Sequence, residues 1–163
     1  MKILITGTPG AGKSTLSNEI SHLYNIPHID ISKYIKENKL YDSKDHKLDT
    51  LIFDKDNVRN HLLEYLQDKE SFIIDTHSPL LVDFIKFDFT FLVKVSTEVL
   101  YTRLRQRGYS KMKIKENINC EIFEVIEDYL SEMDFPFYLV GEEEGFLTKD
   151  DVISQIGKCK LYK

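Results

Sequence analysis

The sequence predicts an α/β domain with a mostly parallel sheet and helices on its faces. Short all-apolar runs, as found in strands buried on both faces, alternate with segments whose apolar residues recur at helical spacing. This alternation is typical of units in which a helix joins two parallel strands. The chain has 163 residues and shows no repeat or low-complexity tract, so we expect a single domain over residues 1–163.

The individual elements follow from apolar spacing and from residues that start or stop helices. Residues 3–5 predict the first strand, a helix follows from Lys13 until Pro27 ends it, and residues 29–31 predict a second strand. Residues 32–54 are polar and charged apart from a helical piece over 34–38, which indicates an inserted flap. The remaining expected elements are a helix over 56–67, strands over 72–74 and 89–95, a helix from a cap at Ser96 or Thr97 to Gly108, one long or two joined helices over 111–132, a fifth strand over 137–140, and a last helix from Thr148 to 156.

Net charge, apolar stretches and cysteine spacing argue against several classes of protein. The net charge of −5 argues against direct DNA binding. No apolar stretch reaches the length of a membrane span, and we expect an intracellular protein with no membrane partner. The two cysteines, Cys120 and Cys159, form no CxxC pair, so a zinc or redox site is not expected.

A glycine-rich loop follows the first strand. Residues 7–14 read GTPGAGKS and match the pattern GxxxxGK[ST] of the phosphate-binding P-loop at every fixed position. Glycines let successive backbone N–H groups turn toward phosphate oxygens, and the next helix adds its positive N-terminal end. Lys13 can then reach the β- and γ-phosphates of ATP, and the Ser14 hydroxyl can bind Mg²⁺. The alternative is a glycine-rich turn without a ligand.

Two polar residues follow the third predicted strand. Asp75 stands at its carboxyl end, where ligands bind in open α/β sheets, and it is the candidate for the Mg²⁺ shell beside Ser14. The alternative for Asp75 is a turn or a helix cap. His77 could handle a proton or order an attacking water, or it could be a surface residue.

A basic segment follows the fourth predicted strand. Arg103 and Arg107 are four residues apart on one predicted helix and therefore share a face. Arginine could offset the charge that develops during phosphoryl transfer, but cations also complement a helix C-terminus. For Arg105 and for Lys111, Lys113 and Lys115 we favour a solvated surface.

Residues 107–123, RGYSKMKIKENINCEIF, resemble the signature of the adenylate kinase isoenzyme 6 family. The GTPG start of the loop, the element Asp75-x-His77 and the Leu40-Tyr41-Asp42 stretch agree with that family in order and spacing. The resemblance implies a P-loop NTPase of the nucleoside-monophosphate-kinase type, with five parallel strands. It also implies an NMP-binding insert at about residues 30–53 and a short lid at about residues 106–116.

The resemblance further implies site residues. Lys13, His77, Arg103 and Arg107 would be catalytic, with His77 serving the ATPase activity and Arg107 reaching ATP from the lid. Ser14 and Asp75 would serve the metal. ATP would bind Gly10, Ala11, Gly12, Lys13, Ser14, Thr15 and Arg107. Many such kinases carry an arginine where this chain has Lys36, a point charge without a planar fork. We read Cys120 as a buried packing residue.

The implied activity is ATP + AMP to 2 ADP with Mg²⁺, together with a slow ATPase. For eukaryotic members the resemblance implies a small-subunit ribosomal protein as partner, a role in maturation of that subunit, and a location in cytoplasm and nucleus. We expect a monomer. One alternative is an ATP-driven assembly factor or switch whose kinase activity is incidental. A kinase for another small metabolite is a second alternative. A GTPase is a weaker alternative, because the Asn-Lys-x-Asp motif of such proteins is missing.

Overall fold

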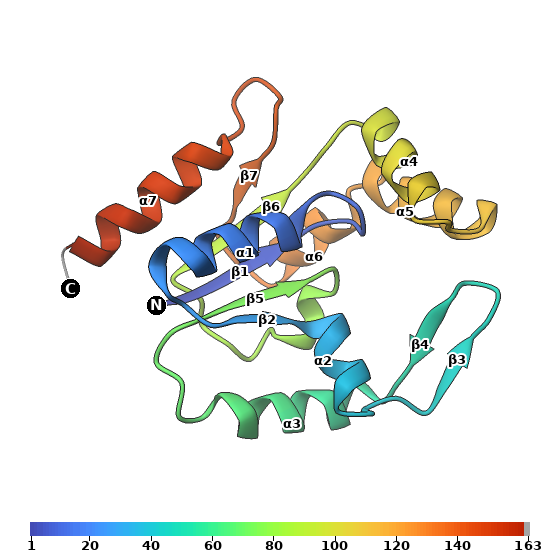
Figure 1. Ribbon diagram of the computed structural model, residues 1–163, viewed down its shortest axis with the longest axis horizontal. Coiled ribbons are helices and arrows are strands. Elements are labelled where there is room, and N and C mark those ends of the chain that lie inside the picture. The colour runs from blue at the N-terminus through green and yellow to red at the C-terminus, as the bar shows by residue number, and fades with distance from the viewer. Residues whose placement is uncertain (162–163) are drawn as a thin grey trace.

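A computed structural model describes residues 1–161 of the chain (Figure 1). Within these residues a five-stranded sheet has the order β2-β5-β1-β6-β7, and each neighbouring pair is parallel. The strands are β1 (Lys2–Thr6), β2 (His28–Asp30), β5 (Phe72–Thr76), β6 (Phe89–Val93) and β7 (Tyr138–Val140). The predicted fold class is therefore confirmed, while residues 162 and 163 of the predicted domain lie outside the described part.

Helices cover both faces of the sheet. They are α1 (Lys13–Tyr24), α2 (Ile31–Glu37), α3 (Lys55–Leu66), α4 (Thr97–Gln106), α5 (Lys111–Ile122), α6 (Val125–Glu132) and α7 (Lys149–Leu161), with a short 3₁₀ turn η1 (Pro79–Leu81). Successive β1 residues point to opposite faces. Ile3 and Ile5 pack in one cluster with buried residues of α1 and α7, and Leu4 packs in the other with α2, α3 and α6.

The segment 29–54 differs from its prediction in two respects. Ile31 begins α2 rather than ending a strand, because the Asp30 side chain caps the helix by accepting a hydrogen bond from the Lys33 N–H at 3.1 Å. The segment is only partly a flap, since Tyr34 and Ile35 are buried in the main core. The remainder forms an unpredicted antiparallel hairpin of β3 (Ser43–Asp45) and β4 (Thr50–Ile52).

Two details of the second half concern the segments around α5. The stretch 111–132 is two helices, because Glu124 adopts a left-handed conformation with φ 52° between α5 and α6. Leu100 and Leu104 of α4 pack against Ile114 of α5 in a small cluster of their own. In Figure 1, the α4–α5 pair and the β3–β4 hairpin both project beyond the same edge of the sheet.

The strand register decides which side chains meet at that edge. Thr6 at the end of β1 lies opposite Thr76 of β5, and Asp30 at the end of β2 lies opposite Asp75. The three loops that leave these strands therefore start side by side, at the carboxyl edge where α/β domains bind ligands. No helix in residues 1–161 has the length and apolar character needed to cross a membrane.

Candidate functional site

The loop between β1 and α1 has the backbone of a phosphate cradle. Gly7 has φ 144°, and a Cβ there would lie 2.3 Å from the Val93 carbonyl oxygen, so only glycine fits. Gly12, with φ 116°, stands at the N-cap of α1 and offers no side chain to that helix end. The first N–H groups of α1 are thus left for an anionic ligand at the positive end of the helix.

Lys13 is held inside this loop. The residue is 8% exposed, and its ammonium donates to the Thr8 carbonyl at 3.1 Å. Burial lowers the pKa of Lys13 from 10.5 to about 8, a change that Asp75 opposes and that the positive charge of Arg107 reinforces. A triphosphate in the loop would favour the ammonium form and would raise the pKa of Lys13 again.

Ser14 and Asp75 form the candidate metal position. The Ser14 hydroxyl donates to Asp75 Oδ2 at 2.5 Å, and Asp75 is 3% exposed. Behind it, His28 Nε2 lies 3.6 Å from the same carboxylate oxygen. A hydroxyl and a carboxylate that converge beside a phosphate loop are hard oxygen donors of the kind Mg²⁺ prefers, so the residues fit this ion.

His77 faces the same cleft. The residue is exposed to the cleft. The surrounding protein still reduces the hydration of the ring, and this desolvation, together with the charge of Lys13, lowers the pKa of His77 to about 4. The ring is therefore neutral near pH 7 and accepts a proton weakly. This favours ordering of a water or phosphate over general-base catalysis.

The two predicted arginines lie in different places. Arg103 Nη1 donates to the carbonyl oxygens of Gly10 at 3.2 Å and Ala11 at 3.0 Å, so it supports the loop from behind. Arg107, at the end of α4, lines the cleft. Arg103 is not among the lining residues within the described chain. Their catalytic roles stay predictions.

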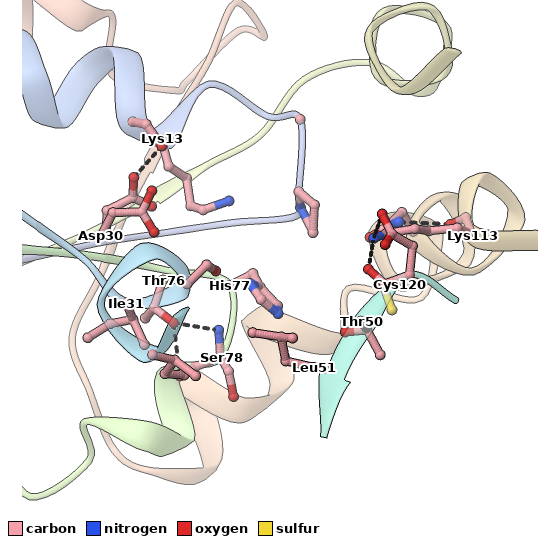
Figure 2. Close-up of a pocket in the computed structure, with 18 of the residues that line it drawn as sticks. Lys13, Asp30, Ile31, Thr50, Leu51, Thr76, His77, Ser78, Lys113 and Cys120 are labelled. Atoms are coloured by element: carbon pink, nitrogen blue, oxygen red, sulfur yellow. Dashed lines mark hydrogen bonds and ion pairs between the residues drawn. The ribbon is translucent and has the colours of Figure 1, made fainter. Parts of the chain in front are cut away.

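The cleft has a volume of about 550 Å³. Its walls come from five segments, within residues 9–15, 30–35, 48–53, 75–81 and 107–120. Figure 2 shows Lys13 and His77 entering it near the sheet, while Lys113 and Cys120 project from α5 on the side of Thr50. One half thus belongs to the P-loop, and the other half lies between α2, β4 and α5.

Sequence reasoning missed the cleft face of α5. Lys113 was expected on a solvated surface and Cys120 in the core, but both line the cleft, and Cys120 is exposed because its face of α5 borders the cleft. The helical spacing of Lys113, Asn117 and Cys120 placed them on one face of a helix, but it did not show that this face borders the cleft. Lys36, by contrast, is exposed and does not line the cleft in the described chain.

A further unpredicted contact joins α5 to the P-loop. The Thr8 hydroxyl donates to Glu121 Oε2 at 2.5 Å. Burial raises the pKa of Glu121, and the hydrogen bond from Thr8 opposes that change. The carbonyl of Thr8 also accepts from Lys13 and from the Ala11 N–H at 3.0 Å, so one residue connects α5, the loop and its lysine.

The fold and this site define a P-loop kinase domain. The chain is similar to deoxyadenosine kinase from M. mycoides, with a TM-score of 0.58 at 23% identity and with all of both chains covered. It is also similar to shikimate kinase from Acinetobacter baumannii, with a TM-score of 0.62 at 15% identity over 99% of this chain and 93% of that one. At such identities the likeness shows the fold alone.

Sequence comparison narrows the class to a family. Residues 3–124 match the model of the AAA domain family. The chain is 38% identical to the adenylate kinase isoenzyme 6 homolog of Caenorhabditis elegans, over 74% of this chain and 67% of that protein. It is 37% identical to the homolog of Drosophila melanogaster, over 86% and 81%. The chain belongs to the adenylate kinase isoenzyme 6 family.

Proposed function

We propose that this protein is an adenylate kinase that transfers the γ-phosphoryl group of Mg-ATP to AMP and yields two ADP. The observation that carries this proposal is that a P-loop with a buried Lys13 opens into a cleft of about 550 Å³, which continues between α2, β4 and α5. The family supports the choice of nucleotides, because the relatives are named adenylate kinase isoenzyme 6 homologs.

In this proposal the ATP phosphates lie along Gly10, Ala11, Gly12, Lys13, Ser14 and Thr15. Lys13 and Arg107 offset the charge that spreads over the transferring group. Ser14 and Asp75 would hold Mg²⁺, which would supply further neutralisation of the phosphate charge. A phosphate oxygen of AMP forms the new P–O bond as the bond to the ADP leaving group breaks. We further propose an insert at about residues 30–53 and a lid at about residues 106–116 that close on the substrates.

The proposal is tested by following ADP production from Mg-ATP with and without AMP. We expect AMP to stimulate turnover strongly and two ADP to form for each AMP consumed. ATP hydrolysis that AMP does not change would contradict the kinase assignment.

A second candidate is an ATPase that acts as an assembly factor. His77 lies in the cleft, where it could order an attacking water, and Ile122 and Phe123 at the end of α5 are 57% and 69% exposed. These apolar residues directly follow Glu121, which contacts the P-loop, so a partner on them could sense the nucleotide. A small-subunit ribosomal protein as that partner, the role in subunit maturation and the location in cytoplasm and nucleus rest on the family resemblance. The monomeric state stays an expectation.

A further inference from the structure

The insert contributes no cation to the half of the cleft that would receive AMP. Within the described residues 30–53, those that line the cleft are acidic, hydroxyl-bearing or apolar, such as Asp30, Ser32 and Leu51. The lysines of this segment are all exposed and outside the lining: Lys33, Lys36, Lys39, Lys44 and Lys47. A bound phosphate dianion therefore needs positive charge from another element.

The other cations of the cleft belong to its ATP half. Lys13 is bonded to the Thr8 carbonyl inside the P-loop. Arg107 is close enough to Lys13 to affect its pKa. Both charges are expected to be occupied by the phosphates of ATP.

Lys113 supplies the missing charge from the opposite wall. It lies in the first turn of α5, and its ammonium donates to the Asp49 carbonyl at the tip of the β3–β4 hairpin at 2.6 Å. Its side chain is 16% exposed, and Figure 2 shows it beside Thr50. The hairpin thus holds this ammonium at the acceptor half without neutralising it through a close ion pair, since the Asp49 carboxylate is 3.8 Å away and is already paired with Lys44 at 2.5 Å.

The hydrogen bond of Lys113 to the Asp49 carbonyl is exchangeable. A neutral carbonyl is a weaker partner for an ammonium than a phosphate dianion, because hydrogen bonds between two charged groups are stronger. Lys113 can therefore leave Asp49 for an incoming phosphate with a net gain.

We propose that Lys113 is the residue that binds the phosphate of the acceptor nucleotide, so that the lid helix α5, and not the insert, selects a nucleoside monophosphate over a nucleoside. The inference rests on the proposed function and specifies its acceptor subsite. Lys113 would contact the substrate directly, and the Asp49 carbonyl would accept the hydrogen bond of this ammonium before the substrate binds.

The test compares AMP with adenosine as ligands of the wild type, Lys113→Met and Lys113→Arg, by titration calorimetry. Lys115→Met is the matched control, because Lys115 is an exposed lysine on the same helix that does not line the cleft in the described chain. We expect Lys113→Met to weaken AMP binding about 10- to 100-fold, the range for one charged hydrogen bond. Adenosine binding should stay within twofold, and Lys113→Arg should recover most of the AMP affinity.

The outcomes separate this inference from the proposed function. Equal AMP affinity of Lys113→Met and wild type would overturn the inference alone. A parallel loss for AMP and adenosine would also overturn it, since the residue would then only shape the cleft. A wild type that binds no AMP would overturn the inference and the acceptor of the proposed function together. In steady-state assays, the supporting result is a higher KM for AMP with the KM for ATP unchanged.

Discussion

Replacing Lys13 with methionine should remove catalysis and yet stabilise the fold. The side chain is almost fully buried, and its pKa falls from 10.5 to about 8 mainly because burial disfavours the ammonium. That fall corresponds to about 3 kcal/mol, at about 1.4 kcal/mol for each tenfold change in the protonation constant. The native state carries this cost at pH 7, where Lys13 is protonated in both the folded and the unfolded chain.

Methionine has a similar length and no charge, so Lys13→Met avoids the cost. The variant loses the hydrogen bond to the Thr8 carbonyl, worth about 1 kcal/mol, but that oxygen keeps its bond from the Ala11 N–H. The expected net gain in the free energy of unfolding is therefore about 2 kcal/mol at pH 7. Kinase turnover should fall by about 10²–10³ or more, as for other groups that stabilise transition-state charge.

The stability difference between Lys13→Met and the wild type should depend on pH. Between about pH 8 and pH 10.5 the unfolded chain keeps the proton on Lys13 and the folded chain does not, so the wild type gains stability as pH rises. The advantage of Lys13→Met should shrink across this window. Urea denaturation of both proteins at pH 7 and at pH 9.5 measures this difference. A variant less stable than wild type at pH 7, or an advantage that does not change with pH, would refute the reasoning.

Three further predictions concern the other site residues. Asp75→Asn should keep the hydrogen bond from Ser14 but lose the carboxylate charge, so the Mg²⁺ concentration for half-maximal activity should rise several-fold, and an unchanged metal titration would favour a structural role. His77→Gly should lower ATP hydrolysis more than tenfold, because it removes the ring that would order the attacking water. Because the pKa of His77 is about 4, the wild-type rate should show no inflection from this ring between pH 6 and pH 8. Arg103→Met should weaken ATP binding about tenfold by releasing the carbonyls of Gly10 and Ala11, whereas Arg105→Met, on an exposed position of the same helix, serves as the control that should bind ATP normally.

The sequence by itself determined the features that depend only on residues close together along the chain. The P-loop lies within residues 7–14, and its glycines and lysine all belong to one loop. The motif could therefore be identified without knowing what packs against it. The apolar runs of β1, β5 and β6 likewise require burial on both faces wherever they lie. The cap at Asp30 is local as well, but it was missed because Ile31 also fitted a strand of alternating residues.

Only the tertiary structure decided which faces meet across the cleft. Lys113 and Asp49 are 64 residues apart, Arg103 and Gly10 are 93 apart, and Thr8 and Glu121 are 113 apart. Each contact depends on how α4, α5 and the hairpin pack around the carboxyl edge of the sheet. Spacing along α5 could place Lys113 and Cys120 on one face. It could not show whether that face meets solvent or a ligand cleft, because polar or mixed residues occur in both. The direction of that face was decided by the packing of Ile114 against Leu100 and Leu104, which no local pattern specifies.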